Sequence, residues 1–185
     1  IGKMHVHPPR LTCGFQNLQL HDGYLGCYRN MQIPHWMHQD VTDDYLYDLR
    51  NALGEDADIN ATGAECNSWV THPWIYEERL HPTNWVADRS IRFLKTRDRT
   101  RPFFLMSSFV RPHQPLDPPQ TYFDMYKDKA LRLPADGDWD PQEGCGTAGR
   151  ISDSIYGCCD ESMRLDAMAG YYASITHVDH QLGRI

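Results

Sequence analysis

Hydrophobic side chains recur at helical spacing in three parts of the chain. Residues 43–54 predict a short amphipathic helix that stops at Gly54, and residues 84–96 predict a second helix with Thr83 as its N-cap. Residues 161–185 predict a long helix, because their apolar positions repeat at steps of three or four. That stripe consists of Leu165, Met168, Tyr172, Ile175, Asp179 and Leu182. We expect Asp179, its charged member, to be at least half-buried with a backbone or arginine partner.

A continuous apolar run, PFFLMSSFV at residues 102–110, predicts a β-strand that is buried on both faces. It follows the helix of residues 84–96, and a helix that leads into a buried strand is half of a βαβ unit. Residues 1–6 are typical of the end of another strand, and a short helix is expected from about Pro119. Residues 130–160 are rich in glycine, proline and aspartate and predict a long loop. The fold class predicted from this order is α/β.

Composition limits the possible partners. The 185 residues are 41% hydrophobic and 23% charged, which is typical of one globular domain. The 18 basic and 25 acidic side chains give a net charge of −7, so we expect neither nucleic acid nor an anionic membrane as a partner. The chain has no apolar run long enough to cross a membrane and begins with isoleucine, without an export signal. We therefore expect a soluble protein of unknown location, with any export signal upstream of residue 1.

The cysteines do not predict a metal site. The 6 cysteines stand at positions 13, 27, 66, 145, 158 and 159 and include no Cys-x-x-Cys pair. Their spacing matches no zinc pattern, and a disulfide framework is not expected in a chain of this length. We expect most of them to be buried free thiols.

Histidines occur in pairs that are candidates for chelating a metal. The pairs are His5 with His7, His35 with His38, and His177 with His180, and we assign no role to His35 and His38. A His-x-His on a strand places both rings on one face, as in amidohydrolases, but two prolines follow His7, and we expect the strand to end near His5. The His177 pair lacks an accompanying glutamate pattern, which favours histidines at the surface.

Lys3, His5 and His113 are the strongest candidates for chemistry. Lys3 and His5 lie at the end of the first predicted strand, and His113 follows the second predicted strand in the sequence RPHQP. The carboxyl ends of parallel strands share one edge, where α/β sheets bind ligands, so these side chains are expected to converge there. Lys3 would supply a compact positive charge for an anionic oxygen, and His5 would carry a proton near neutral pH.

Four stretches follow one another along the chain. They are GKMH at residues 2–5, HPTNWVADRSIRFL at 81–94, RPFFLMSSFVRPHQPLDPPQTYFDMY at 101–126 and YYASITHVDHQLGRI at 171–185. In this order they resemble the type I sulfatase family, arylsulfatase-like members of the alkaline-phosphatase-like superfamily. The resemblance implies an α/β three-layer sandwich with a mostly parallel sheet flanked by helices. Residues 1–185 would be the central part of a single sulfatase catalytic domain.

The resemblance implies a sulfuric ester hydrolase that cleaves a sulfate monoester of a small molecule or a glycan. Its nucleophile would be a formylglycine, and its cofactor one divalent cation, usually calcium. Lys3 and His5 match the Gly-Lys-x-His motif of the family. By this analogy Lys3 contacts sulfate and the formylglycine hydroxyl, and His5 supports that hydroxyl and its deprotonation. His113 matches the histidine that contacts the sulfate ester, and it is a candidate to protonate the leaving oxygen.

Three parts of the family pattern are missing from this sequence. No cysteine or serine begins the nucleophile motif, and neither the paired aspartates of the first strand nor the downstream Asp-Asn-Gly metal segment occurs. We therefore expect an internal fragment that is inactive by itself, with the nucleophile and the calcium ligands outside it. A missing first strand would expose a sheet edge and apolar surface, so missing parent segments or a homo-oligomer are expected partners.

Three alternatives remain open from the sequence. The first is a phosphonate monoester or phosphodiester hydrolase of the same superfamily, because similar histidine motifs occur there. The second is a non-catalytic relative that binds sulfated glycans without a nucleophile. The third, an unrelated His-x-His metallohydrolase, would bind stoichiometric zinc.

Overall fold

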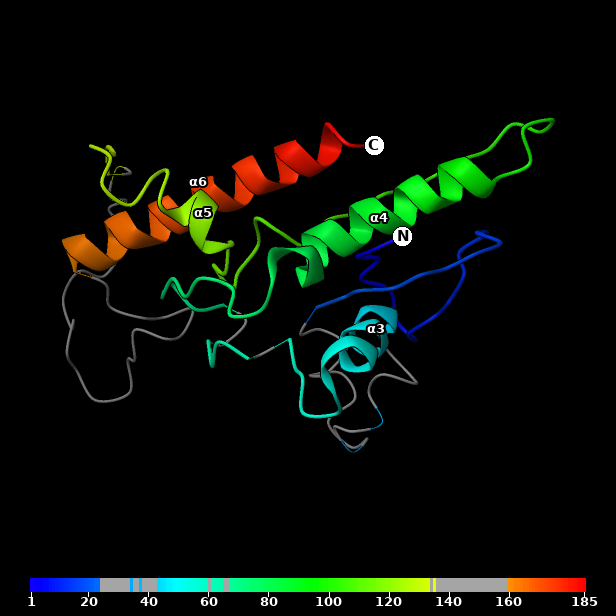
Figure 1. Cartoon of the computed structure of the whole chain (residues 1–185), viewed down its shortest axis with the longest axis horizontal. Helices are drawn as coiled ribbons and strands as arrows, with labels where there is room; N and C mark the ends of the chain where they lie inside the picture. Colours follow the sequence, from blue (N-terminus) through cyan, green and yellow to red (C-terminus); the bar gives the residue numbers. More distant parts are fainter. Residues whose placement is uncertain are drawn as a thin grey trace. The chain divides into compact units, whose positions relative to one another are not determined.

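The computed structural model describes residues 1–23, 34, 37, 43–59, 61–64, 67–133, 135 and 160–185. Its helices, shown in Figure 1, are α3 (Asp44–Leu53), the short 3-10 helix η2 (Glu78–Leu80), α4 (Pro82–Thr96), α5 (Gln120–Phe123) and α6 (Glu161–Leu182). The chain divides into two compact units. Unit 1 comprises Ile1–Ala61, Tyr76–Val110 and Val178–Ile185, and unit 2 comprises Thr62–Ile75 and Arg111–His177.

Helix α3 confirms its prediction at both ends. The Asp43 side chain caps the first turn by accepting a hydrogen bond of 3.0 Å from the Leu46 amide. Gly54 ends the helix with a φ of 105°, a conformation that glycine adopts without steric cost. The buried side of α3 contributes to the core of unit 1, which consists of Tyr45, Leu46, Leu49, Ala57, Ile59, Trp85 and Val86.

Helix α4 begins earlier than the sequence predicts. Pro82 stands in its first turn, and Nδ1 of the His81 ring accepts a hydrogen bond of 3.1 Å from the Thr83 amide. The prediction of Thr83 as the N-cap is therefore wrong, because an imidazole takes the place of the usual hydroxyl and proline suits a first turn. Trp85 joins α4 to α3, since its ring packs edge-on to Tyr45 with centroids 5.8 Å apart.

Backbone pairing near Gly2 is parallel. Gly2 forms isolated parallel bridges with Leu20 and with Ser108, so it lies between two other segments of unit 1. The Gly2 amide donates to the Gln19 carbonyl at 2.8 Å, and the Lys3 amide donates to the Ser108 carbonyl at 2.9 Å. A Cβ at Gly2 would lie 1.9 Å from the Ser108 oxygen, so this approach requires glycine. Among the described residues, pairing is limited to isolated bridges, and a full parallel sheet stays a prediction.

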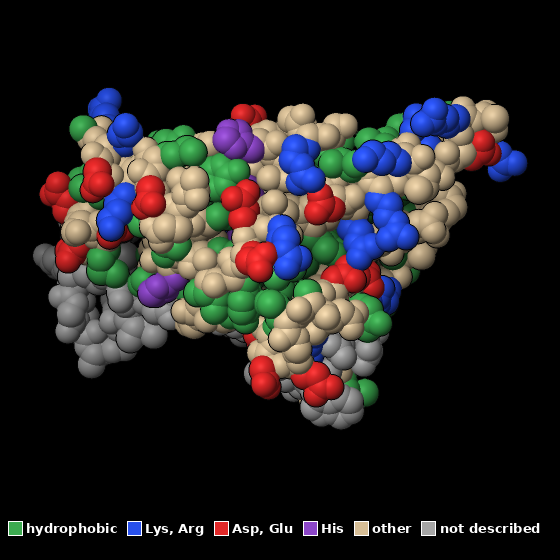
Figure 2. All heavy atoms as spheres, in the orientation of Figure 1, with side chains coloured by type: hydrophobic (Ala, Val, Ile, Leu, Met, Phe, Trp, Pro, Cys, Tyr) green, Lys and Arg blue, Asp and Glu red, His purple; other side chains and the backbone are tan. Residues whose placement is uncertain are grey.

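The segment of residues 102–110 differs from the strand that was expected. Phe103 and Phe104 are 48% and 77% exposed and residues 105–109 are only partly buried, so the expectation of burial on both faces is wrong for all of the run except Val110. Phe104 stacks on Phe15 with centroids 5.8 Å apart, and the Arg97 guanidinium lies 4.8 Å from the centroid of the Phe103 ring. Figure 2 shows basic side chains beside hydrophobic ones at the C-terminal end of α4. These contacts place the rings at the surface of unit 1 and not in its core.

Small residues form the buried face of α6 in unit 2. They include Ala167, Ala169, Gly170, Ala173 and Ser174. Thr71, which pairs in parallel with Leu116, lies directly against this face. A Cβ at Gly170 would lie 2.6 Å from Thr71 Oγ1, so the short side chains bring the helix backbone close to this pair. Among the described helices, none is long and apolar enough to cross a membrane.

The apolar stripe predicted for α6 is on the wrong side of the helix. Tyr172, Ile175 and Leu182 are 40%, 41% and 52% exposed, and Asp179 is exposed as well. Spacing alone marks large apolar residues as the buried set. Around Gly170 the close backbone approach leaves room for methyl groups and hydroxyls instead, so Tyr172 and Ile175 lie outside, and the large buried side chains of α6 are the polar His177 and Gln181.

Replacing Gly170 with alanine should lower the free energy of unfolding by about 1–3 kcal/mol, because the new methyl group overlaps the Thr71 side chain. In an open helix the same change would raise stability by about 0.5–1 kcal/mol. The Thr71 side chain is held in place, since its Oγ1 donates to the Asp166 carbonyl at 2.9 Å. Urea unfolding measures the effect. The loss should shrink in a Thr71→Ala background, and a stabilised Gly170→Ala variant would contradict the close approach.

Candidate active site

A carboxylate holds the backbone of the Gly-Lys-Met-His segment. Asp22 Oδ1 accepts hydrogen bonds from the Met4 amide at 2.6 Å and from the His5 amide at 3.0 Å. His5 has a φ of 54°, in the left-handed region that residues other than glycine rarely adopt. The two charge-assisted hydrogen bonds offset this strain. Asp22 thereby holds the backbone from which the His5 side chain extends, while the Lys3 amide is held by the Ser108 carbonyl.

The first turn of α3 holds Asp22 in turn. The Leu20 amide donates to Asp44 Oδ2 at 2.7 Å, and the Asp44 amide donates to the Leu20 carbonyl at 3.0 Å. His21 Nδ1 lies 3.0 Å from Asp43 Oδ2, and both side chains are buried. An ionised carboxylate only accepts hydrogen bonds, so Nδ1 of His21 is the donor. Residues 20–22 therefore connect the start of α3 to the candidate catalytic segment.

Lys3 and His5 have no competing partner in the part of the chain that the structure describes. The Lys3 side chain is half-buried and has no carboxylate beside it, and the His5 ring is exposed and makes no hydrogen bond there. A partly buried ammonium without a carboxylate neighbour attracts an anionic oxygen more strongly than an ammonium in bulk water. Within the described residues, the Lys3 ammonium and the His5 ring are therefore not engaged by other side chains.

His113 lies in the loop that follows residues 102–110. Its ring is exposed, and Nδ1 lies 2.7 Å from the carbonyl oxygen of Gln114. A carbonyl oxygen can only accept, so Nδ1 keeps a proton whether the ring is neutral or charged. Among the described residues, Nε2 is the ring nitrogen of His113 that makes no hydrogen bond.

The candidate residues fall in different units. Lys3 and His5 belong to unit 1 together with Asp22, whereas His113 belongs to unit 2. Lys3 and His5 are two residues apart in the sequence and lie on one short segment of unit 1. The convergence of His113 with them at a single sheet edge stays a prediction.

The other histidine pairs do not form a metal centre in the described residues. Nowhere in that part of the chain do three or more histidine, cysteine, aspartate or glutamate side chains gather in a way that could hold an ion. His177 is 1% exposed and stacks on Tyr122 with centroids 4.7 Å apart, so the expectation that it lies at the surface is wrong. His180 is exposed, as expected. His35 and His38 lie outside the described residues.

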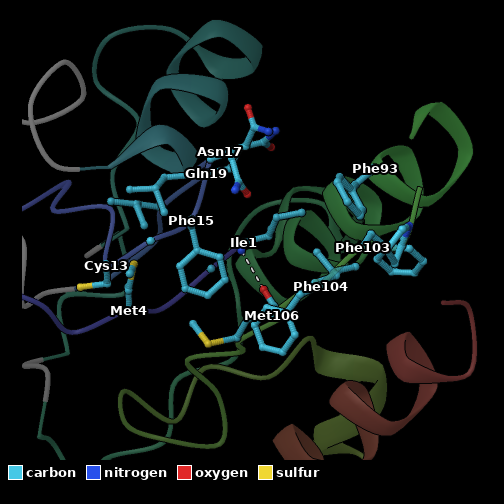
Figure 3. Close-up of a pocket in the computed structure, with 17 residues that line it drawn as sticks. Ile1, Met4, Cys13, Phe15, Asn17, Gln19, Phe93, Phe103, Phe104 and Met106 are labelled. Carbon is cyan, nitrogen blue, oxygen red and sulfur yellow. Dashed lines mark hydrogen bonds between the residues drawn. The ribbon is translucent and has the colours of Figure 1, made fainter. Parts of the chain in front are cut away.

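A hollow of about 740 Å³ lies in unit 1 beside the Gly-Lys-Met-His segment (Figure 3). Its lining includes Met4, Phe15, Phe104 and Cys13. Cys13 is a free thiol and is exposed, and because the other cysteines lie outside the described residues, the expectation that most thiols are buried stays a prediction. None of the described side chains that line the hollow is charged, and the lining is mostly apolar with the amide side chains of Gln16, Asn17 and Gln19 among it.

Sequence reasoning did not single out Asp22. It stands in GFQNLQLHDGY, and an aspartate followed by glycine is typical of a turn. The available signal was the alternation of Leu18, Leu20 and Asp22, which places the carboxylate on the same face as the two leucines of a short extended segment. The carboxylate binds the amides of residues 4 and 5, and alternation does not reveal these partners.

Replacing Asp22 with alanine should lower the free energy of unfolding by about 1.5–3 kcal/mol, because two amides lose a charged acceptor in a buried place. Hydrogen exchange at the Met4 and His5 amides should accelerate at the same time. Asp88→Ala is the matched control, because its carboxylate pairs with Arg184 at the surface, and it should change stability by less than about 0.5 kcal/mol. Equal losses in the two variants would contradict the holding role of Asp22.

Comparison with known proteins identifies the family. The family model described as Sulfatase matches residues 26–185. An arylsulfatase from Clostridium perfringens (strain 13 / Type A) is 51% identical over 184 residues, which are 100% of this chain and 38% of that protein. A sulfatase from Formosa agariphila is 30% identical over 107 residues, 55% of this chain and 20% of that protein. The chain thus spans well under half the length of these relatives, and it belongs to the sulfatase family.

Proposed function

We propose that this chain is the central part of a sulfuric ester hydrolase, a sulfatase that cleaves a sulfate monoester of a small molecule or a glycan. The observation that carries the proposal is the 51% identity, over 100% of the chain, to a protein named arylsulfatase. The activity is assigned to a longer protein, because the chain spans 38% of that relative. The chain by itself is expected to be inactive.

The proposal includes an α/β three-layer fold for the catalytic domain, with residues 1–185 at its centre. The parallel bridges of Gly2 with Leu20 and with Ser108, and of Thr71 with Leu116, support it. Parallel pairs join segments that cannot be linked by a tight hairpin, as in a sheet with helical crossovers. The segments around these residues would be strands of a mostly parallel sheet with helices on its faces.

Lys3 and His5 would act on the sulfate and on the nucleophile. Sulfate transfer gathers negative charge on the equatorial oxygens, and a fixed cation in a partly dry site stabilises that charge better than water does. The Lys3 ammonium is such a cation, since no carboxylate pairs with it in the described part of the chain. His5, held by Asp22, would support the hydroxyl of the nucleophile and accept its proton.

His113 would protonate the departing oxygen. The Gln114 carbonyl binds Nδ1–H, so the charged ring carries its second proton on Nε2. Nε2 then donates that proton to the alkoxide that leaves the sulfur, and the ring returns to its neutral form. A positioned acid of this kind contributes about 10²–10⁴-fold to the rate.

The nucleophile and the metal are assigned to other parts of the longer protein. No cysteine or serine of this chain stands in the nucleophile motif of the family, so the formylglycine would come from elsewhere. The described residues offer no cluster of ligands that fits calcium or another divalent cation. No step of the chemistry is therefore assigned through a metal on these residues.

Further polypeptide would cover part of unit 1. The hollow lined by Met4 and Phe15 is mostly apolar, and Phe104 is 77% exposed beside it. Apolar surface of this kind is typically covered in the assembled protein. Missing parent segments or a second copy of the chain are the proposed partners.

Assays of the full-length protein on aryl esters with one common leaving group test the activity. We expect hydrolysis of the sulfate in preference to the phosphonate monoester and the phosphodiester. Lys3→Ala should lose both binding and turnover, which shows that the activity belongs to this protein. Preference for the phosphorus esters would replace the proposal with a phosphonate monoester or phosphodiester hydrolase. Binding of a sulfated glycan without hydrolysis would replace it with a non-catalytic relative.

Replacing His113 with alanine should reduce kcat/KM by about 10²–10⁴-fold for sulfate esters of weakly acidic alcohols. The loss should be much smaller for nitrophenyl sulfate, because a stable leaving oxygen needs no acid. A plot of log kcat/KM against leaving-group pKa for both proteins measures the difference as a steeper slope in the variant. His180→Ala, at an exposed position of α6, is the control and should keep the wild-type slope. Parallel plots for His113→Ala and wild type would refute the acid role.

A further inference from the structure

A buried ion pair closes the loop that carries His113. Arg111 Nε lies 2.5 Å from Asp117 Oδ1, and Arg111 Nη2 lies 2.5 Å from Asp117 Oδ2. The two side chains are 4% and 1% exposed. Two parallel hydrogen bonds between a guanidinium and a carboxylate fix direction as well as distance. The pair therefore sets the separation and the relative orientation of the two ends of residues 111–117.

The Asp117 end of the loop is attached to a second segment of unit 2. The His72 amide donates to the Leu116 carbonyl at 3.0 Å, and the Trp74 amide donates to the Pro118 carbonyl at 3.0 Å. These bonds lie on either side of Asp117, so its carboxylate has a fixed position relative to residues 72–74. Through the ion pair, the Arg111 side chain is also fixed relative to residues 72–74.

The ring of His113 is fixed relative to the loop by a local bond. Its Nδ1 lies 2.7 Å from the Gln114 carbonyl oxygen, so rotation of the ring away from that oxygen costs a hydrogen bond. The orientation of Nε2 then depends on the backbone of the loop. The backbone of the loop depends on the ion pair across its ends.

Burial of this pair is not explained by stability. Removing two charges from water costs as much as their attraction returns, and apolar residues of similar size often stabilise a protein equally well. Unlike an apolar contact, a bidentate ion pair fixes the distance and the orientation of its two side chains. A fixed geometry matters where a proton must reach one oxygen, because small displacements of a catalytic group greatly lower the rate.

We propose that the Arg111–Asp117 ion pair is a positioning element for His113, which aims Nε2 at the leaving oxygen of the sulfate ester. This inference rests on the proposed sulfatase function. The pair itself touches no reacting atom, and its effect on the rate passes through the imidazole. Loss of the ion pair should therefore have the kinetic effect of a displaced His113.

A double-mutant cycle in the full-length protein tests the proposal. Arg111→Met with Asp117→Leu removes both charges together, so that neither is left buried alone. We expect kcat/KM to fall by about 10–100-fold for sulfate esters of weakly acidic alcohols and by much less for nitrophenyl sulfate. In a His113→Ala background the same pair of changes should alter kcat/KM by less than about twofold. A role confined to stability would give the same loss in both backgrounds, and that result would overturn the proposal.

Two further variants separate positioning from general damage. Arg111→Lys keeps the charge but loses the fork, so it should show an intermediate loss with the same dependence on the leaving group. It also replaces the double variant if that protein fails to fold. Arg184→Met with Asp88→Leu makes the matching change at an ion pair whose side chains are 45% and 53% exposed, and it should keep wild-type kinetics. A comparable loss in this control would overturn the assignment to the His113 loop.

Hydrogen exchange gives a readout that does not depend on sulfatase activity. Peptides that cover residues 111–123 should exchange faster in the variant without the ion pair, while peptides of α3 and α4 keep their protection. If the wild-type protein hydrolyses only phosphorus esters, the sulfatase proposal fails and the kinetic cycle is run on those esters. If it hydrolyses neither sulfate nor phosphorus esters, the sulfatase proposal also fails, and hydrogen exchange alone tests the positioning role of the ion pair. Unchanged exchange in residues 111–123 would overturn the positioning role in every case.

Discussion

The pairing of residues 20–22 with the Gly-Lys-Met-His segment is the interaction on which unit 1 depends. Leu20 pairs in parallel with Gly2 and bonds to Asp44, while Asp22 binds the amides of residues 4 and 5. The first turn of α3 and the candidate catalytic segment are thereby held by the same three residues. Because α3 also carries the core contacts of Leu46 and Leu49, the position of the segment is coupled to the packing of the unit.

Buried carboxylates perform the same physical task in both units. Asp22 binds backbone amides beneath Lys3 and His5, and Asp117 binds a guanidinium across the loop of His113. Each orders the backbone from which a candidate side chain extends, and each carboxylate is engaged by backbone amides or by a guanidinium.

Local sequence patterns predicted the helices well and their buried faces poorly. Asp43 and Gly54 mark the ends of α3 because capping and left-handed glycine are local effects. The cap of α4 lies at His81 and not at Thr83, because the His81 ring accepts the hydrogen bond that a hydroxyl usually accepts there. The buried face of α6 was wrong for a different reason: contact with Thr71 selects small residues, and that contact lies far away in sequence.

Motif order in the sequence determined the family and the candidates Lys3, His5 and His113, because these depend on residue type and spacing alone. Tertiary structure decided what holds them. The bonds from Asp22 and the ion pair of Arg111 with Asp117 depend on orientation as well as on residue type. Alternation and periodicity describe which face a side chain occupies, whereas a hydrogen bond requires two atoms to meet at a defined distance and angle. That condition is met only when the chain has folded.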